Sequence, residues 1–391
     1  MNHSWSETWR KELDGLAERG LLRRLRPSIP RAPGCRFIEE TECVDLSSND
    51  YLGLAHHEQL SEALAEGAAR WGTGAASSRM IVGHTEAHAV LEDRLATLKR
   101  TEASLVFASG YQANVGLFSA LVGRHDVVAA DRLCHASILD GIRLSGAKLE
   151  RFRHNDPEHL EGILSATKRR ALVATESIFS MDGDVAPLPQ ILDTVARHGA
   201  LLVVDEAHAT GVLGERGGGA WDHFALPTGP DVPVVLMGTL SKAVGCQGGF
   251  VCGPRLLIEY LVNRCRSFIF STGLSPALAW ASVRALEILV TDRERREALR
   301  SNARLLRSSL ARHLRPGHEP PTPIIPLIVG DANKSMDMSR RLLTRGILTI
   351  AVRPPTVPEG TSRLRLTVSA AHCPEDLTRA AKAIGEDLAS S

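Results

Sequence analysis

Three polar residues with chemical potential follow two apolar segments in the middle of the chain. Asp205 and His208 come directly after the run Leu201–Val204, and Lys242 follows a second run that begins at Val234. A short apolar run bounded by turn residues is typical of a strand buried on both faces of a parallel sheet. Because open α/β sheets bind ligands at the carboxyl edge of their strands, we expect the acid, the histidine and the lysine to converge there.

An amine and a carboxylate at adjacent strand ends suit an aldehyde cofactor. Lysine forms a Schiff base with pyridoxal phosphate (PLP), and an acid beside the pyridine nitrogen keeps the ring protonated and electron-withdrawing. Lys242 would bind the aldehyde and Asp205 would face the ring nitrogen. Either residue alone is more often a surface lysine or a helix-capping aspartate. The pair, with His208 between its members, favours the cofactor.

The composition limits the class of protein. With 391 residues the chain exceeds one ordinary core, so we expect two or three domains. Its 43% hydrophobic and 23% charged content are typical of a soluble globular protein, and its net charge of +1 gives no reason to expect nucleic acid or an anionic membrane as partner. We find no signal peptide and no apolar run of membrane-spanning length. The 7 scattered cysteines favour reduced thiols in the cytoplasm and no metal site.

The alternation of elements predicts the fold. Strand-like and helix-like segments alternate from Ser104 to Gly253, which indicates an α/β domain with a doubly wound, mostly parallel sheet. Before it, a helix is predicted over Glu86–Arg100. The N-terminal segment predicts an amphipathic helix, followed by a basic loop at Arg23–Pro30. The apolar face of that first helix comprises Trp5, Trp9, Leu13 and Leu16.

A smaller α/β domain is predicted at the C-terminal end. A helix over Ser275–Leu289 leads to P-I-I-P-L-I-V, a helix over Met336–Arg345, G-I-L-T-I-A-V and R-L-R-L-T-V-S. The prolines of R-P-P-T-V-P stiffen the loop between its strands, so Arg353 is held where it could bind a carboxylate in bidentate fashion. We therefore expect an N-terminal helix and arm over 1–45, a large domain over 46–285 and a small domain over 286–391.

Further strand ends add candidate ligand contacts. In S-L-V-F-A-S-G-Y-Q-A-N, the turn at Gly110 and Tyr111 opens a helix whose N-terminus suits a phosphate, although a plain strand–helix turn explains the pattern equally well. His135 ends another strand, where an imidazole can stack on a planar ring. Glu176 and Ser180 follow a third strand. The Gly- and Ser-rich segment Gly72–Thr85 fits neither the dinucleotide nor the triphosphate loop pattern.

These motifs together resemble the α-oxoamine synthase family of fold-type-I PLP enzymes. The segments S-S-N-D-Y-L-G-L, A-S-G-Y-Q-A-N, T-E-S-I-F-S-M-D-G-D, D-E-A-H-A-T-G, T-L-S-K-A and R-P-P-T-V-P-E-G-T-S-R-L-R-L match in order, from about Trp5 to the C-terminus. The motif R-P-P-T-V-P resembles that of the family branch that condenses L-alanine with a pimeloyl thioester. The sequence departs from the pattern at V-G-H-T, where His84 replaces a small amide residue.

The resemblance implies a role for each matching residue. Lys242 is expected to bind the cofactor and act as the base, with Asp205, His208, His135 and Ser180 around the ring. The phosphate contacts implied are Gly110, Tyr111, Thr239 and, from a second subunit, Thr272. The substrate contacts implied are Arg353, Thr356, Asn49 and His135 for the amino acid and Arg23 for the distal carboxylate of the acyl chain.

The implied reaction is a decarboxylating condensation, in a homodimer, of L-alanine with a pimeloyl group carried on CoA or on an acyl carrier protein. Another α-oxoamine synthase, using glycine or serine with a different acyl-CoA, is the nearest alternative. A hydrolase using Ser180, His208 and Asp205 is a second alternative, but the sequence has no G-x-S-x-G turn. A non-catalytic binding protein is a third, and its retention of so many polar residues would be costly.

Overall fold

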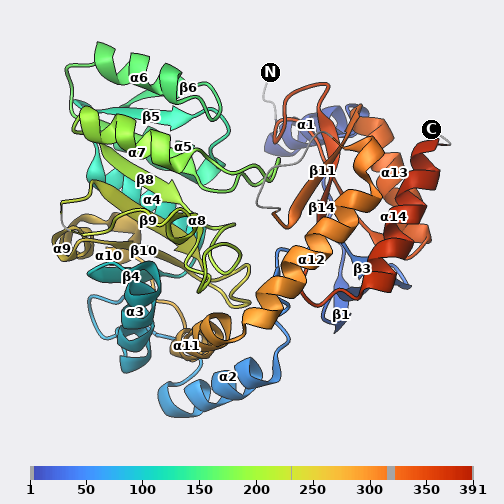
Figure 1. The fold of residues 1–391 in the computed structure, drawn as a ribbon, viewed down its shortest axis with the longest axis horizontal. Coiled ribbons are helices and arrows are strands. Elements are labelled where there is room, and N and C mark those ends of the chain that lie inside the picture. Colours follow the sequence, from blue (N-terminus) through green and yellow to red (C-terminus); the bar gives the residue numbers. More distant parts are fainter. Residues whose placement is uncertain (1–3, 230, 315–321, 390–391) are drawn as a thin grey trace. The chain divides into compact units, whose positions relative to one another are not determined.

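The computed structural model describes residues 4–229, 231–314 and 322–389, and the contacts divide the chain into two compact units. One unit comprises Asn49–Leu299 (Figure 1). The other combines the chain up to Ser48 with the chain from Arg300 onward. The predicted domains 1–45, 46–285 and 286–391 follow chain order and stay a prediction, whereas the second unit is built from both ends of the chain.

A seven-stranded sheet forms the centre of the Asn49–Leu299 unit (Figure 1). Its strands lie in the order β4-β10-β9-β8-β7-β5-β6, and all run in one direction except β10, which is antiparallel to both neighbours. The predicted doubly wound, mostly parallel α/β fold is confirmed. The strands are β4 (Ala103–Phe107), β5 (Val127–Asp131), β6 (Lys148–Phe152), β7 (Ala171–Glu176), β8 (Leu201–Asp205), β9 (Val234–Thr239) and β10 (Gly249–Gly253).

Helices cover the sheet, and they begin and end close to the predicted positions. The helix expected over Glu86–Arg100 is α3 (Glu86–Lys99), and the helix expected over Ser275–Leu289 is α11 (Pro276–Thr291). The other helices of this unit are α2 (Glu58–Trp71), α4 (Gly110–Leu121), α5 (Ala136–Ser145), α6 (Pro157–Ala166), α7 (Leu188–Arg197), α8 (Ala220–His223), α9 (Arg255–Arg264) and α10 (Arg266–Ile269).

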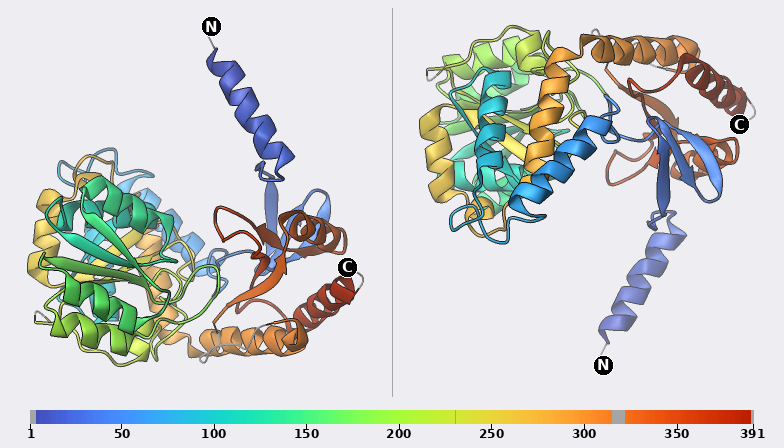
Figure 2. Two further views of the ribbon diagram at one scale, coloured as in Figure 1. Left: turned by 90° about the horizontal axis from the view of Figure 1, so that it is seen from above. Right: turned by 90° about the horizontal axis from the view of Figure 1, so that it is seen from below.

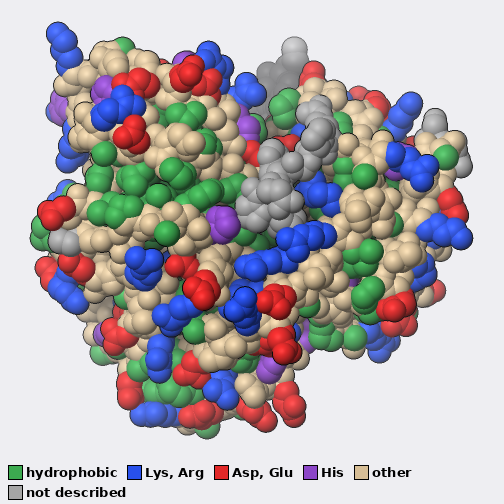
Figure 3. Space-filling model, in the orientation of Figure 1, with side chains coloured by type: hydrophobic (Ala, Val, Ile, Leu, Met, Phe, Trp, Pro, Cys, Tyr) green, Lys and Arg blue, Asp and Glu red, His purple; other side chains and the backbone are tan. Residues whose placement is uncertain are grey.

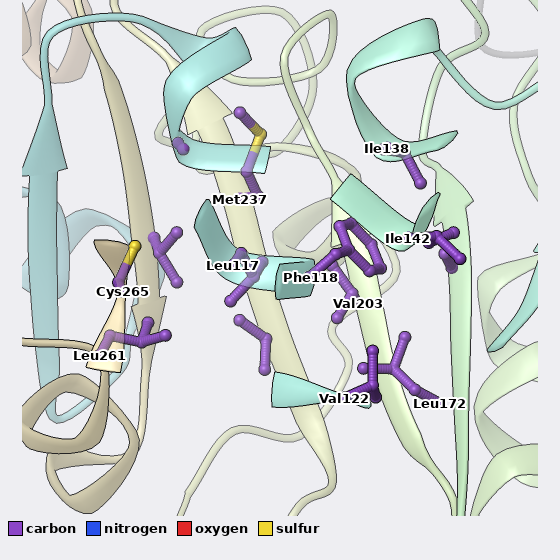
Figure 4. Packing of buried hydrophobic residues seen from close by; sticks show 14 of the residues in the cluster. Leu117, Phe118, Val122, Ile138, Ile142, Leu172, Val203, Met237, Leu261 and Cys265 are labelled. Atoms are coloured by element: carbon purple, nitrogen blue, oxygen red, sulfur yellow. The ribbon is translucent and has the colours of Figure 1, made fainter. Parts of the chain in front are cut away.

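One face of the sheet packs on α4, α5 and α9 to form a large apolar core. Alternate strand residues point into it because side chains alternate between the faces of a strand. Figure 4 shows Leu117 and Phe118 of α4 packed among strand side chains such as Leu172 and Val203. Burial of this helix fixes the position of its first turn, which lies at the carboxyl edge of the sheet.

The second unit contains two small sheets. β11 (Ile324–Gly330), β14 (Ser362–Thr367) and β13 (Ile350–Val352) form an antiparallel sheet from the predicted C-terminal segments. β1 (Ser28–Ala32), β2 (Cys35–Ile38) and β3 (Thr41–Asp45) form the second sheet, and β12 (Ile347–Leu348) joins β3 in parallel. The helical elements here are the latter part of α12 (Arg293–Ser309), η1 (Ala311–His313), α13 (Ala332–Thr344) and α14 (Pro374–Ala389).

Two expectations for the second unit need correction. The segment Arg23–Pro30 is predicted to lead into a loop. In the structure its last three residues are the first residues of β1. Pro30 is tolerated because β1 is an edge strand, where a missing N–H removes no bond to a further strand. The helix expected over Met336–Arg345 starts four residues earlier, since the Asp331 side chain accepts a hydrogen bond from the Lys334 N–H and caps it.

The predicted N-terminal helix is α1 (Trp5–Glu18), and it stands clear of the strands of its own unit (Figure 2). Ser4 caps it through a reciprocal capping box with Glu7. The apolar face remains open, with Trp5 75% and Trp9 57% exposed. Its helical form therefore rests on the cap and on local side-chain pairs, including the stacked rings of Trp5 and Trp9.

On the face drawn in Figure 3, acidic and basic side chains are intermingled, in keeping with the net charge of +1. Within the described ranges, no helix combines the length and the hydrophobicity needed to cross a bilayer.

A buried ion pair connects α3 to the turn that follows β8. Lys99 Nζ lies 2.5 Å from Glu206 Oε2, and both side chains are fully buried. The ammonium group also donates to Thr210 Oγ1 and to the Gly218 carbonyl, each at 2.8 Å. Because Glu206 directly follows Asp205, this pair fixes the chain where the candidate acid emerges from the sheet.

We expect Lys99→Met to lower the stability of this unit by about 3–5 kcal/mol, because Glu206 would be left as an uncompensated buried charge. The change would appear as a lower denaturant midpoint of the purified protein. Lys148→Met is the control, since Lys148 pairs with Glu150 on the surface and should cost about 1 kcal/mol or less. Equal midpoints for the two variants would contradict this account.

Candidate active site

A cavity of about 210 Å³ opens at the carboxyl ends of the central strands. Seven of the residues predicted from the sequence line it: Gly110, Tyr111, His135, Asp205, His208, Thr239 and Lys242. The other lining residues are Ser109, Asn114, Ser137, Glu176, Ala207, Met237 and Ser241. The structure thus brings an acid, two histidines, a lysine and a helix N-terminus into one space.

Asp205 is buried at the end of β8 and is held by two donors. The Ala207 N–H donates to Asp205 Oδ1 at 2.9 Å, and Asn114 Nδ2 donates to Asp205 Oδ2 at 2.8 Å. A buried carboxylate is costly unless it accepts hydrogen bonds, and these two bonds stabilise its charged form. Asp205 is therefore suited to balance a positive charge in the cavity.

Lys242 is the last member of a chain of hydrogen bonds. Its Nζ lies 3.0 Å from His208 Nε2, and His208 Nδ1 lies 2.7 Å from the Tyr51 hydroxyl group. Tyr51 donates in turn to Asn49 Oδ1 at 3.0 Å. If the lysine donates to His208, then His208 carries its proton on Nδ1 and donates to Tyr51, so one tautomer satisfies every member. Asn49, predicted to lie near the substrate, is thereby linked to Lys242.

The first turn of α4 forms a narrow cradle for an anion. A Cβ at Gly110 would lie 3.3 Å from Met237 Cε, and a Cβ at Gly249 would lie 2.6 Å from Gly110 Cα. The backbone can approach closely there only because both residues lack a side chain. The Thr239 hydroxyl, 2.7 Å from Ser241 Oγ, lines the same region. Free N–H groups and hydroxyls at a helix N-terminus match the chemistry of a phosphate.

His135 caps α5 at the edge of the cavity. Its Nδ1 accepts from the Ser137 N–H at 3.2 Å and lies 2.7 Å from Ser137 Oγ, so the proton of the neutral ring resides on Nε2. The ring edge is solvent-exposed, yet desolvation by the surrounding atoms lowers the pKa of His135, with Asp205 opposing and Lys242 adding to the shift. A neutral imidazole can lie flat on an aromatic ring without adding a charge.

The remaining predicted residues do not line this cavity. The Ser180 N–H lies 3.3 Å from Glu176 Oε2, in the loop after β7. Thr272 is exposed and forms a bridge with Ser78, and its predicted contact is with a second subunit. Arg23, Arg353 and Thr356 belong to the unit built from the two chain ends.

Arg353 is held by hydrogen bonds to both its side chain and its backbone. Its guanidinium donates to the Gly20 carbonyl, and the Thr356 N–H donates to the Arg353 carbonyl at 3.1 Å. Burial, followed by the charges of Arg23 and Arg340, lowers the pKa of Arg353. The neighbouring arginines therefore create a positive region that suits a carboxylate.

Several residues that contribute to the site have no role among the sequence predictions. Asn114 lies four residues after Gly110, one helical turn into α4, so the start of a helix at the cavity was the available signal. Glu176 ends β7 as Asp205 ends β8, and the two are in register. Tyr51 and Ser241 adjoin predicted residues and gave no separate signal. His84, which departs from the family pattern, accepts a hydrogen bond from Arg79 Nε at 3.1 Å.

A charged histidine fixes the loop that carries Ser180. His154 Nδ1 lies 3.0 Å from Asp131 Oδ1, and its Nε2 lies 2.7 Å from Asp184 Oδ2. Burial alone would lower its pKa, but hydrogen bonds to the two carboxylates outweigh burial and raise it to about 9. The ring also meets Phe179 edge-on, with the centroids 4.4 Å apart. The loop after β7 is thus tied to the end of β5.

The cavity fits PLP by the chemistry of its lining. The α4 turn, Thr239 and Ser241 would hold the phosphate, Asp205 would balance a ring nitrogen, and Lys242 would bind the aldehyde carbon. The unpartnered Glu176 Oε1 and Asn114 Oδ1 show polar capacity that the described residues do not use among themselves. The described residues contain no group of three or more His, Cys, Asp or Glu side chains placed to hold a metal ion.

Residues 41–384 match the protein family described as aminotransferase class I and II. The chain belongs to this family. The matched region includes every residue that lines the cavity, so the aminotransferase-family match and the site geometry concern the same part of the chain.

Relatives of this aminotransferase-family chain are similar over nearly their whole length. An 8-amino-7-oxononanoate synthase of Geobacter sulfurreducens is 46% identical, covering 96% of this chain and 97% of the relative. One of Methylococcus capsulatus is 47% identical, covering 89% and 90% respectively, and one of Symbiobacterium thermophilum is 43% identical, covering 97% of both. The predicted resemblance to the α-oxoamine synthases is confirmed.

Solved structures extend the likeness to the fold. Serine palmitoyltransferase of Sphingomonas wittichii superposes with a TM-score of 0.91 at 30% identity, covering 99% of this chain and 98% of the other. A structure of SPT with PLP gives 0.91 at 30% identity, covering 98% and 97%. An 8-amino-7-oxononanoate synthase of Francisella tularensis gives 0.76 at 28% identity, covering 89% and 98%. The predicted fold-type-I PLP fold is confirmed.

We expect Gly249→Ala to weaken PLP binding by about 5- to 100-fold, since overpacking costs about 1–3 kcal/mol and the new Cβ would press on the α4 turn. Absorbance titration of the apoprotein with PLP measures the dissociation constant. Gly162→Ala in α6 is the control, because a Cβ there meets no atom within 4 Å. Unchanged affinity in Gly249→Ala would show that the close approach is not required.

The stability of the wild-type protein should decrease as the pH rises from 6.5 to about 9, because the pKa of His154 is higher in the folded state than in the unfolded state. Its contribution is complete below the unfolded value and is lost above the folded value. After allowance for partial exposure we expect about 1–2 kcal/mol. Denaturant midpoints at both ends of this range measure it. His154→Asn should remove this part of the dependence, and an unaltered pH profile in that variant would contradict the assignment.

Proposed function

We propose that this chain is an 8-amino-7-oxononanoate synthase, which condenses L-alanine with a pimeloyl thioester to give 8-amino-7-oxononanoate, CO2 and a free thiol in biotin biosynthesis. The main observation that supports this proposal is the cavity in which Lys242, Asp205, His208 and the α4 turn meet. Relatives that share 43–47% of their residues with this chain over most of its length bear that enzyme's name. The PLP-bound structural relatives support the cofactor.

When bound, PLP supplies an electron sink for the negative charge that develops on the amino acid Cα. Lys242 removes the α-proton, and the hydrogen bond between its Nζ and His208 keeps the amine directed into the cavity. Asp205 keeps the ring nitrogen protonated through its own buried charge. His135 covers the ring as a neutral imidazole. The phosphate would contact Gly110, Tyr111 and Thr239. Ser180 would lie beside the ring.

The substrate carboxylates are assigned to arginines of the second unit. Arg353 would bind the alanine carboxylate with Thr356 and Asn49 nearby, and Arg23 would bind the distal carboxylate of the pimeloyl chain. The support is chemical: the pKa of Arg353 is lowered first by burial and then by the charges of Arg23 and Arg340, so positive charge is concentrated there. A dicarboxylic acyl chain and an amino acid supply such anions.

We also propose a cytoplasmic homodimer in which Thr272 contacts the phosphate of the partner's site. Exposed apolar side chains surround this residue in the described structure, with Ile81 75%, Val82 73% and Phe270 70% exposed. The bridge between Ser78 and Thr272 holds the two loops together. Such a patch on a monomer is typical of an interface. The seven free cysteines favour a reducing compartment.

Another α-oxoamine synthase remains the second candidate, because serine palmitoyltransferases superpose with TM-scores of 0.91. Their identity to this chain is 30%, below that of the oxononanoate synthases in sequence comparison. The experiment that separates the two is product mass spectrometry with alanine and pimeloyl-CoA, using glycine, serine and shorter or longer acyl-CoA as controls. A product formed only from glycine or serine would overturn the proposal.

We expect Lys242→Ala to lower kcat for condensation by at least about 10³-fold, because the variant lacks both the cofactor link and the base. Product formation by mass spectrometry and the absorbance of bound PLP measure the two losses separately. Lys168→Ala, at an exposed lysine outside the cavity, should behave as wild type. Condensation at the wild-type rate in Lys242→Ala would show that another residue is the base.

A further inference from the structure

Two acidic side chains lie next to each other at the bottom of the site. Glu176 ends β7 and Asp205 ends β8, and the register of these parallel strands pairs them directly. In-register neighbours point to the same face of a sheet, about 4.8 Å apart. Glu176 is 2% exposed and Asp205 is 5% exposed, so both carboxyl groups are largely removed from bulk solvent. Two carboxylates in such a position cannot both be ionised at low cost.

The hydrogen bonds indicate which of the two is charged. Both oxygens of Asp205 accept from N–H donors, one from Ala207 and one from Asn114. Glu176 Oε2 accepts from the Ser180 N–H at only 3.3 Å, the His135 N–H also faces this carboxyl group, and Oε1 has no hydrogen-bond partner within the described residues. A charged oxygen needs donors, whereas a protonated oxygen is itself a donor. The arrangement therefore places the negative charge on Asp205 and a proton on Glu176.

The surrounding charges support this assignment. Burial, and then the charge of Asp205, raises the pKa of Glu176 to about 8, although Lys242 and the N–H groups of His135 and Ser180 oppose the shift. The Cys134 thiol, on the segment before α5, has its own pKa raised by burial and then by Glu176. These are the titratable groups that face Glu176 from β8, from the turn after β9 and from the start of α5.

Glu176 also lines the cavity, although none of the roles assigned above uses it. We propose that Glu176 carries a proton at neutral pH and donates it in a hydrogen bond to an acceptor atom of PLP bound in this cavity. The ligand's identity rests on the proposed function. The unpartnered, buried Oε1 of Glu176 is the donor atom. The adjacent Asp205 then remains the single negative charge beside the ring.

The protonation state can be tested without cofactor or reaction. Infrared difference spectra of the apoprotein should show the carbonyl band of a protonated carboxyl group that is lost as the pH rises through about 8. The band should be absent from Glu176→Gln and retained in Glu92→Gln, at a partly buried glutamate that is ion-paired with Arg79. Identical spectra for wild type and Glu176→Gln at pH 7 would overturn the proposal.

The donor role needs a second comparison. Glu176→Met removes the donor at similar volume, so PLP should dissociate about 5- to 10-fold more readily than from wild type. Glu176→Gln, which restores an N–H donor, should recover most of that affinity in the same absorbance titration. Equal affinity in the Met and Gln variants, with native circular dichroism in both, would overturn the donor role. If the wild-type apoprotein itself fails to bind PLP, the proposed function fails while the infrared result stands.

Discussion

The carboxylate of Asp205 must remain charged inside the protein, and much of the site follows from that requirement. Its charge is stabilised by the Ala207 N–H and by Asn114, which also donates to Ser137 Oγ at 3.0 Å. Ser137 in turn contacts His135. Because Asn114 lies on α4, the helix that stabilises the acid also supplies the anion cradle in its first turn. One electrostatic demand therefore couples Asp205, His135 and the α4 turn, which are proposed to contact the ring nitrogen, the ring face and the phosphate.

Parallel strand direction made the main part of this site predictable. Strands that share a direction deliver their last residues to one edge, so apolar runs followed by Asp205, Lys242 and His135 could be assigned to one place without coordinates. The glycine at position 110 indicated a turn in which the backbone can approach closely. Helix limits agreed to within a few residues wherever caps were evident, and failed at α13, whose cap lies before the apolar periodicity begins.

What could not be predicted depends on register and on contacts between distant segments. The pairing of Glu176 with Asp205 requires knowing which strands are neighbours, since the two residues are 29 positions apart along the chain. The same holds for His154 between Asp131 and Asp184, where each residue alone is an ordinary polar loop residue. The strands β1 to β3 are short and partly exposed, so their alternation is too weak to be recognised.

The parallel pairing of β3 with β12 has a consequence for biosynthesis on the ribosome. Val44 and Ile347 are partners, although about three hundred residues of chain are made between them. The Asn49–Leu299 segment emerges as an uninterrupted stretch and can acquire its sheet first. Until β12 is made, one edge of β3 has no partner. Exposed strand edges of this kind can pair with the wrong segment. Completion of this protein is thus timed by its last hundred residues, and nascent chains released early would carry an open strand edge near their N-terminus.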